Sequence, residues 1–150
     1  MIKKKLVAVA SGGGHWKQLM LISPAFEEFD THYITTICGL PENSGIKNFS
    51  IVQDSNKSNK INIILTFYQI FKILLKEKPD VIISTGAAPG ILSVAIGRLI
   101  GAKTIWIDSI ANGEELSLGG KISTKISHVV MSQWEEVAEQ NQVDFKGSIF

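Results

Sequence analysis

The residues best suited to chemistry follow the first apolar run of the chain, where Ser-Gly-Gly-Gly-His occupies positions 11–15. Three consecutive glycines let the backbone turn sharply and leave no side chain to block a ligand. The first amides of a helix that begins here are unpaired donors suited to anionic or sugar oxygens. His15 stands beside them, and histidine is a residue type that serves as a general acid or base. The segment predicts a binding loop, although a tight strand-to-helix turn without a ligand would use the same residues.

Two further segments combine small residues with a position after a predicted strand. Ser-Thr-Gly-Ala-Ala-Pro-Gly occupies 84–90, and its proline suits the first turn of a following helix. Asp-Ser-Ile-Ala-Asn-Gly-Glu occupies 108–114. The first of these segments is equally compatible with an ordinary strand-to-helix turn. Asp108 is either a ligand-binding carboxylate or a cap for the turn that follows it. Together the three loops favour a ligand site more than any one of them alone.

The elements that must position these loops alternate between strands and helices. We predict strands over Lys5–Ala10, His32–Ile37, Phe49–Gln53, Val81–Ser84, Thr104–Ile107 and Val129–Ser132. We predict helices over His15–Phe29 with a break at Pro24, Ile61–Lys76, Gly90–Ile100 and Trp134–Gln140, a loop over 39–48 and a polar link over Ser55–Asn59. This alternation predicts the α/β class, with a Rossmann-like parallel sheet and helices on both faces. Ligands of such sheets bind at the carboxyl ends of the strands, where all three loops lie.

Composition limits the class of protein. A length of 150 residues, of which 45% are hydrophobic, fits a single globular domain over 1–150. The net charge of +1 argues against a general nucleic-acid binder. The single cysteine, Cys38, cannot form an internal disulfide, and only five apolar residues follow the basic N-terminus before Ser11. That run is too short for a signal core or a membrane span, so we expect a cytoplasmic protein.

Several familiar chemistries do not fit the sequence. Lys17 stands where the third glycine of a G-x-G-x-x-G dinucleotide fingerprint belongs, and no G-x-x-x-x-G-K-[ST] phosphate loop occurs. The three histidines and Cys38 show no metal-ligand spacing. Ser11 lacks the G-x-S-x-G setting of a hydrolase nucleophile. We therefore expect neither a metal nor a cofactor.

The predicted helix Ile61–Lys76 is apolar over an unusually wide arc, since 11 of its 16 residues are apolar. Its polar residues form one stripe over about a third of the circumference: Asn62, Thr66, Gln69, Lys72 and Lys76. Either the helix is sandwiched in the core, or its surplus apolar surface meets a membrane or a partner protein. Five lysines and one glutamate between Lys57 and Lys78 give a local charge of +4, which suits an anionic membrane surface. The helix is too short and too polar to span a membrane.

The chain resembles the acceptor-side subunit of the split glycosyltransferase of asparagine-linked glycosylation (the Alg-fourteen family), and especially its bacterial PssD-type relatives. The matching segments run in order along nearly the whole chain. They are Ser-Gly-Gly-Gly-His at 11–15, Ser-Thr-Gly-Ala-Ala-Pro-Gly at 84–90, Trp-Ile-Asp-Ser-Ile-Ala at 106–111, Ser-Gln-Trp-Glu-Glu-Val at 132–137 and Phe-Lys-Gly-Ser-Ile-Phe at 145–150.

The resemblance implies the N-terminal, acceptor-binding half of a two-domain GT-B glycosyltransferase such as MurG. The donor-binding half would be a separate partner chain, and 150 residues are indeed too few for two such domains. The complex would move a sugar from UDP-GlcNAc or a related UDP-hexose to a lipid-linked acceptor, in capsule, exopolysaccharide or lipid-linked oligosaccharide synthesis. This subunit, inactive alone, would recruit its partner to the inner face of the cell membrane, to which it would attach peripherally.

Two departures from the family limit this transfer of properties. The family usually has Glu-Ser-x-x-Arg where this chain has Asp108 to Asn112, so the arginine contacts do not carry over. We also expect no counterpart of the N-terminal membrane anchor of the eukaryotic members, which would leave membrane attachment to the apolar helix and its lysines.

The roles expected from these arguments fall into three groups. His15 is the expected base or acceptor-orienting residue, with Asp108 as the second candidate. The expected acceptor-binding residues are Ser11, Gly12, Gly13, Gly14, Thr85, Gly86 and Ser109. The expected membrane or partner contacts are Phe67, Phe71, Lys72, Lys76, Ile149 and Phe150. Two other functions stay open: a non-catalytic scaffold that activates the transferase, and a free-standing nucleotide- or small-molecule-binding domain.

Overall fold

Seven parallel strands form one sheet in the computed structural model, which describes residues 2–55 and 59–150. Their order across the sheet is β3-β2-β1-β4-β5-β6-β7. The strands are β1 (Lys5–Ala10), β2 (Asp30–Thr35), β3 (Phe49–Ile51), β4 (Val81–Gly86), β5 (Lys103–Ile107), β6 (Val129–Ser132) and β7 (Asp144–Phe145). The predicted parallel α/β sheet is thus confirmed.

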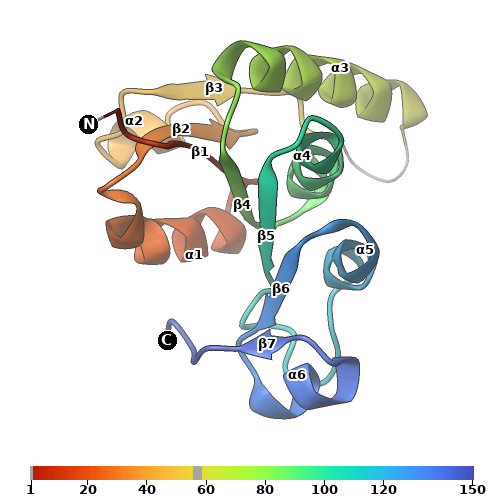
Figure 1. The fold of residues 1–150 in the computed structure, drawn as a ribbon. Helices are drawn as coiled ribbons and strands as arrows, with labels where there is room; N and C mark the ends of the chain where they lie inside the picture. The colour runs from red at the N-terminus through yellow and green to blue at the C-terminus, as the bar shows by residue number, and fades with distance from the viewer. Residues whose placement is uncertain (1, 56–58) are drawn as a thin grey trace.

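Helices cover both faces of the sheet (Figure 1). They are α1 (Gly14–Ile22), the 3-10 helix η1 (Ser23–Phe26), α2 (Leu40–Asn43), α3 (Lys60–Glu77), α4 (Ala88–Leu99), α5 (Leu118–Ile126) and α6 (Glu135–Asn141). α1 lies against one face, whereas α3 and α4 lie side by side over the other.

The first apolar run becomes the central strand because it is buried on both sides. Successive side chains of a strand point to opposite faces, and β1 divides its residues accordingly. Val7 and Val9 pack in one core cluster with Ile70 and Leu74 of α3. Ala8 packs on the other face in a cluster that includes Leu19 of α1. A strand that joins two cores requires an uninterrupted run of apolar residues, as this sequence has.

The predicted elements differ from the observed ones where local signals are weak. Helix α1 ends at Ile22 and continues as η1 around Pro24, so the predicted break is confirmed. The prediction of a loop over 39–48 was wrong in part. This segment contains the one-turn helix α2, and Pro41 lies in the first turn of that helix. Residues 56–58 of the predicted polar link, which include Lys57, lie outside the described residues.

Two elements were missed by sequence analysis. Helix α5 contains Gly119 and Gly120, which lower its intrinsic helix propensity. Ser117 compensates as the N-cap, because its hydroxyl accepts a hydrogen bond of 2.9 Å from the amide of Gly120. β7 is only two residues long and gave no pattern to detect.

Three of the five residues in the polar stripe of α3 face the protein, whereas Lys72 and Lys76 are exposed. The hydroxyl of Thr66 donates to the carbonyl of Gln53 at 2.8 Å. The side-chain oxygen of Gln69 accepts from the amide of Gln53 at 2.8 Å, and that of Asn62 accepts from the side-chain amide of Gln53 at 2.8 Å. Three polar residues of α3 thus form hydrogen bonds with Gln53, which follows β3.

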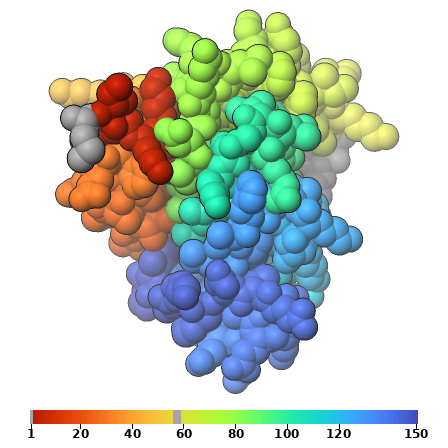
Figure 2. All heavy atoms as spheres, viewed as in Figure 1, coloured from red at the N-terminus to blue at the C-terminus, as the bar shows by residue number. Residues whose placement is uncertain are grey.

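The apolar arc of α3 consequently faces outward. Its exposed large apolar residues are Ile61, Ile64, Leu65, Phe67, Tyr68, Phe71 and Leu75. In Figure 2 the yellow-green atoms of α3 lie along the upper margin of the molecule. The interpretation that the core sandwiches this helix is therefore wrong for the outer arc. Within residues 2–55 and 59–150, no helix combines the length and apolarity needed to cross a membrane.

Adjacent leucines of α3 offer a direct check of this orientation. Leu74 is fully buried, whereas Leu75 is 48% exposed. We expect Leu74→Ala to lower the free energy of unfolding by about 2–5 kcal/mol, because it leaves a cavity in the core. Leu75→Ala should change it by no more than about 0.5 kcal/mol. Urea denaturation of both variants measures the difference, and equal losses would contradict the orientation described here.

Candidate functional site

The first two loops, after β1 and β4, meet where the order of the strands across the sheet reverses. β1 and β4 are neighbours in the sheet, yet the helices that follow them, α1 and α4, lie on opposite faces. This arrangement leaves a crevice outside the carboxyl ends of the two strands, the usual ligand position in doubly wound folds. A hydrogen bond of 3.2 Å from the amide of Ser11 to the carbonyl of Gly86 ties the two loops together.

His15 is held in a defined orientation by the second loop. Its Nδ1 lies 3.0 Å from the carbonyl oxygen of Thr85, and the Thr85 hydroxyl donates to the carbonyl of His15 at 2.7 Å. A carbonyl oxygen only accepts, so Nδ1 carries the proton in this hydrogen bond. In the neutral imidazole, Nε2 is then the basic nitrogen. His15 and Thr85 both line a hollow of about 320 Å³.

Gly86 makes room for this histidine. Its φ of +127° lies in the region that side chains rarely adopt, and a β-carbon at this position would collide with Nδ1 of His15. Gly86 is therefore required both for the local backbone conformation and for the placement of the His15 imidazole.

The glycines of the first loop have different roles. A β-carbon on Gly12 would collide with the side chain of Ile37, so Gly12 allows close packing. Gly13 is the N-cap of α1 with a φ of +68°, and open space surrounds the position of its missing β-carbon. Gly13 and Gly14 are exposed, and no side chain caps the start of α1. The first amides of α1 are thus accessible, as predicted from the sequence.

Asp108 lines the same hollow but has structural hydrogen bonds. It is 2% exposed and accepts from the indole nitrogen of Trp106 at 3.0 Å and from the amide of Ser117 at 2.8 Å. The Ser117 hydroxyl also donates to it. Both carboxylate oxygens thus accept hydrogen bonds from the protein, but Asp108 is not the expected cap of the turn at 109–112, where the Ser109 hydroxyl accepts from the amide of Ala111 at 3.2 Å. Asp108 instead anchors Ser117 at the start of α5.

Sequence reasoning missed two buried glutamines that organise the edge of the site. Gln18 of α1 donates to the hydroxyl of Ser109 at 3.0 Å and accepts from the amide of Ile110 at 3.2 Å. Gln133, after β6, donates to Gln18 at 2.6 Å and to the carbonyl of Asp108 at 3.0 Å. Their amide groups fix the third loop against the helix that carries His15. A polar residue in a buried helix position was the only available signal, and it does not reveal its partner.

The structure brings together some of the predicted residues and separates others. His15, Thr85, Gly86 and Asp108 surround the hollow. Ser109 is buried beside it under Gln18. The predicted membrane or partner residues form two separate surfaces: Phe67, Phe71, Lys72 and Lys76 lie on α3, while Ile149 and Phe150 lie near the start of α1. The main-chain amide of Ile149 donates to Gln133 at 3.2 Å, and the Lys17 ammonium lies 5.8 Å from the Phe150 ring.

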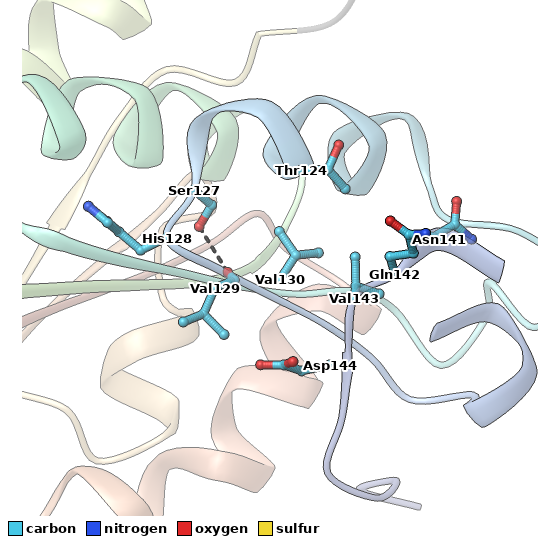
Figure 3. Close-up of a pocket in the computed structure, with 9 residues that line it drawn as sticks. All are labelled: Thr124, Ser127, His128, Val129, Val130, Asn141, Gln142, Val143 and Asp144. Carbon is cyan, nitrogen blue, oxygen red and sulfur yellow. Dashed lines mark hydrogen bonds between the residues drawn. The ribbon is translucent and has the colours of Figure 1, made fainter. Parts of the chain in front are cut away.

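Another hollow, of about 350 Å³, lies at the opposite edge of the sheet (Figure 3). It is formed where β6 and β7 begin and where α5 and α6 end, with Asn141 and Gln142 on one side and Thr124 above. His128 at this edge has a structural role, since its Nδ1 accepts from the main-chain amide of Thr104 at 3.1 Å. The loops singled out by sequence analysis do not reach this hollow.

Comparison with known proteins decides the family. The sequence model of the family described as "Oligosaccharide biosynthesis protein Alg14 like" matches residues 46–149. This chain belongs to that family. The mouse protein named "UDP-N-acetylglucosamine transferase subunit ALG14" is 25% identical to this Alg14-like chain, and the alignment covers 91% of this chain and 78% of the mouse protein.

Solved structures share the fold of this Alg14-like chain. MurG from Acinetobacter baumannii superposes with a TM-score of 0.73 at 12% identity, over 89% of this chain and 43% of MurG. The UDP-N-acetylglucosamine 2-epimerase from Rickettsia bellii superposes with a TM-score of 0.76 at 17% identity, over 98% of this chain and 45% of the epimerase. The chain thus spans less than half of each structure and corresponds to one half-domain of the GT-B fold.

A glycine pair tests whether Gly86 is needed to seat His15. Gly86→Ala and Gly101→Ala both place a side chain at positive φ, but only the former brings a β-carbon against His15. We expect both variants to lose stability, and only Gly86→Ala to change the imidazole signals of His15 in ¹H–¹⁵N NMR spectra. Unchanged His15 signals in folded Gly86→Ala would contradict the packing described here.

Proposed function

We propose that this chain is the acceptor-binding subunit of a two-chain glycosyltransferase that transfers a sugar from a UDP-sugar to a lipid-linked acceptor. The observation that carries this proposal is the oriented His15, with Nδ1 bonded to Thr85 and Nε2 left as the base beside a hollow. The name of the mouse relative, a UDP-N-acetylglucosamine transferase subunit, supports the reaction class. UDP-GlcNAc or a related UDP-hexose is the donor that we propose.

In the proposed step, the acceptor hydroxyl attacks the anomeric carbon of the donor sugar as its proton passes to Nε2 of His15. The bond from that carbon to the UDP oxygen breaks, and UDP leaves with the electron pair. The configuration at the anomeric carbon inverts. A positioned base of this kind contributes roughly 10²–10⁴-fold to the rate. Asp108 contributes by anchoring the start of α5 beside the hollow, because its oxygens already accept hydrogen bonds from the protein.

The exposed first amides of α1 would hold acceptor hydroxyls or the lipid pyrophosphate. No side chain caps the N-terminus of this helix, so these main-chain donors are available. The positive end of its helix dipole favours an anion there. Gly13 and Gly14 keep the approach free of side chains.

The donor sugar would bind to a second chain. This chain covers 43% of MurG, a length that accounts for one of two halves. The carboxyl edge of the sheet, where His15 lies, would face the donor-binding partner. We propose that the partner contact includes the C-terminal tail, in which Phe150 is exposed.

We further propose that α3 attaches the complex peripherally to an anionic membrane at the inner face of the cell. Its outward apolar arc carries Phe67 and Phe71, whose rings stack 6.2 Å apart. Lys72 and Lys76 flank this arc as exposed cations. An apolar face beside lysines is the composition of helices that lie in the interface of anionic bilayers. Synthesis of capsule, exopolysaccharide or a lipid-linked oligosaccharide would fit this placement.

Removing the proposed base tests the mechanism. His15→Asn keeps an amide that can donate to Thr85 but cannot take up the acceptor proton. We expect kcat of the complex, formed by co-expression with the partner chain, to fall roughly 10²–10⁴-fold in a UDP-sugar transfer assay. His128→Ala is the matched control, because that histidine lies at the opposite edge of the sheet, and it should leave the rate unchanged.

The same assay separates the two rival functions. A non-catalytic scaffold predicts full activity in His15→Asn, and loss of the complex when residues 148–150 are deleted. A free-standing nucleotide-binding domain predicts that the isolated chain binds a UDP-sugar without any partner. Full activity in His15→Asn would overturn the role proposed for His15, and a UDP-sugar bound by the isolated chain would overturn the placement of the donor on a second chain.

Vesicle binding tests the membrane surface. We expect the protein to sediment with vesicles of phosphatidylglycerol and phosphatidylcholine at low salt, and Phe67→Ser/Phe71→Ser to abolish this binding. Lys72→Gln/Lys76→Gln should weaken it, since each basic residue near an anionic surface is worth about 1 kcal/mol. Leu99→Ser removes an even more exposed apolar side chain, at the end of α4, and should have no effect. Equal binding by the wild type and the phenylalanine variant would rule out α3 as the anchor.

A further inference from the structure

Trp134 forms one wall of a hollow that the proposed reaction does not use. The hollow has a volume of about 370 Å³ and is otherwise lined by the loop of residues 110–115. Trp134 is 43% exposed, whereas Trp16 and Trp106 are buried. A large indole left half open at the carboxyl edge of the sheet is a surface available to a ligand.

The indole is held rigidly. Its Nε1 donates to the carbonyl of Ile110 at 2.7 Å. Gly113 lies against the ring, since a β-carbon there would come within 3.1 Å of Cε2. One side of the ring is thus packed by the loop, and the exposed part forms a flat platform in a fixed orientation.

The platform is connected directly to the helix that carries His15. The amide of Ile110 donates to the side chain of Gln18, and its carbonyl accepts from Trp134. Gln18 lies three residues after His15 on α1. Through Gln18, the main chain of Ile110 links the helix that carries His15 to the indole of Trp134. A ligand that extends from the hollow beside His15 would meet the indole on the far side of this loop.

The lining identifies the class of ligand. Glu114 and Glu115 are exposed beside the indole, and Asn112 adds an amide that both donates and accepts. A hydrogen bond of 2.7 Å from Lys121 lowers the pKa of the Glu115 carboxyl. Carboxylates repel the phosphates of a lipid-linked acceptor, and glutamates are depleted in the cores of protein interfaces. An aromatic plane bordered by hydroxyl-binding groups instead suits a pyranose, with its apolar C–H face and polar rim.

We propose that Trp134 is the stacking platform of a glycan subsite, on which a neutral pyranose ring of the acceptor lies with its hydroxyls towards Glu114 and Asn112. This inference rests on the proposed function in one respect, namely that the pyranose belongs to the acceptor. The subsite holds a sugar away from the phosphate, and it therefore determines which acceptor glycan is used.

Steady-state kinetics of the two-chain complex test the subsite. We expect Trp134→Ala to raise KM for the glycan acceptor roughly tenfold with kcat changed less than about twofold, since ground-state and transition-state binding are lost equally. Trp134→Phe keeps an aromatic face and should restore most of the affinity. Glu114→Ala, at an exposed position, should raise the same KM severalfold and cannot impair the core. Phe145→Ala removes another exposed aromatic residue and serves as the control.

Binding to the isolated chain separates failure of the subsite from failure of the proposed reaction. N,N′-diacetylchitobiose and methyl glucopyranoside in the mM range should shift the indole N–H signal of Trp134 in ¹H–¹⁵N spectra, with the signal of the buried Trp16 as the internal reference. A shift without any transfer activity would support the subsite and overturn the proposed reaction. Transfer activity with no shift and an unchanged KM in Trp134→Ala would overturn the subsite. Loss of the partner chain in Trp134→Ala would assign the indole to a protein interface instead.

Discussion

The carboxyl edge of this sheet depends on one buried interaction, the hydrogen bond between the side chains of Gln18 and Gln133. Gln18 belongs to the first helix, and Gln133 follows the sixth strand. Between them they also bind Ser109, Ile110 and the carbonyl of Asp108. Buried amides are stable only when their donors and acceptors are satisfied, so this network fixes the helix, the loop and the end of the strand together. The hollow beside His15 and the platform of Trp134 lie on either side of that fixed loop.

This constraint explains why the candidate site requires small residues around His15. Thr85 binds both the imidazole and the main-chain carbonyl of His15, and Gln18 ties the same helix to the third loop. The backbone of the second loop must therefore yield, and Gly86 is the residue that lets it pass the imidazole. Preorganisation of this kind reduces the cost of orienting a base when a substrate binds.

Much of the fold could be predicted because its signals are local. The apolar run of β1 and the break at Pro24 follow from residue types alone, and so does the position of His15 after the first strand. The glutamine network could not be predicted, since its members are 115 positions apart in the sequence and a glutamine gives no sign of burial. Helix α5 was missed because its stability comes from Ser117 and Asp108, which cap and anchor it from outside the helical pattern.

The same distinction applies to α3. Its periodicity showed a narrow polar stripe, but amphipathic periodicity does not reveal which side faces the core. The hydrogen bonds of Gln53 determine which side faces the core. Asn62, Thr66 and Gln69 bind its backbone and side chain, and this part of the polar stripe therefore faces inward. Each large apolar side chain left in water forgoes roughly 1.5–3 kcal/mol of burial. The seven residues of the outer arc of α3 are 36–69% exposed, so each of them forgoes part of this burial. This exposed arc is the observation on which the proposed attachment of α3 to a membrane rests.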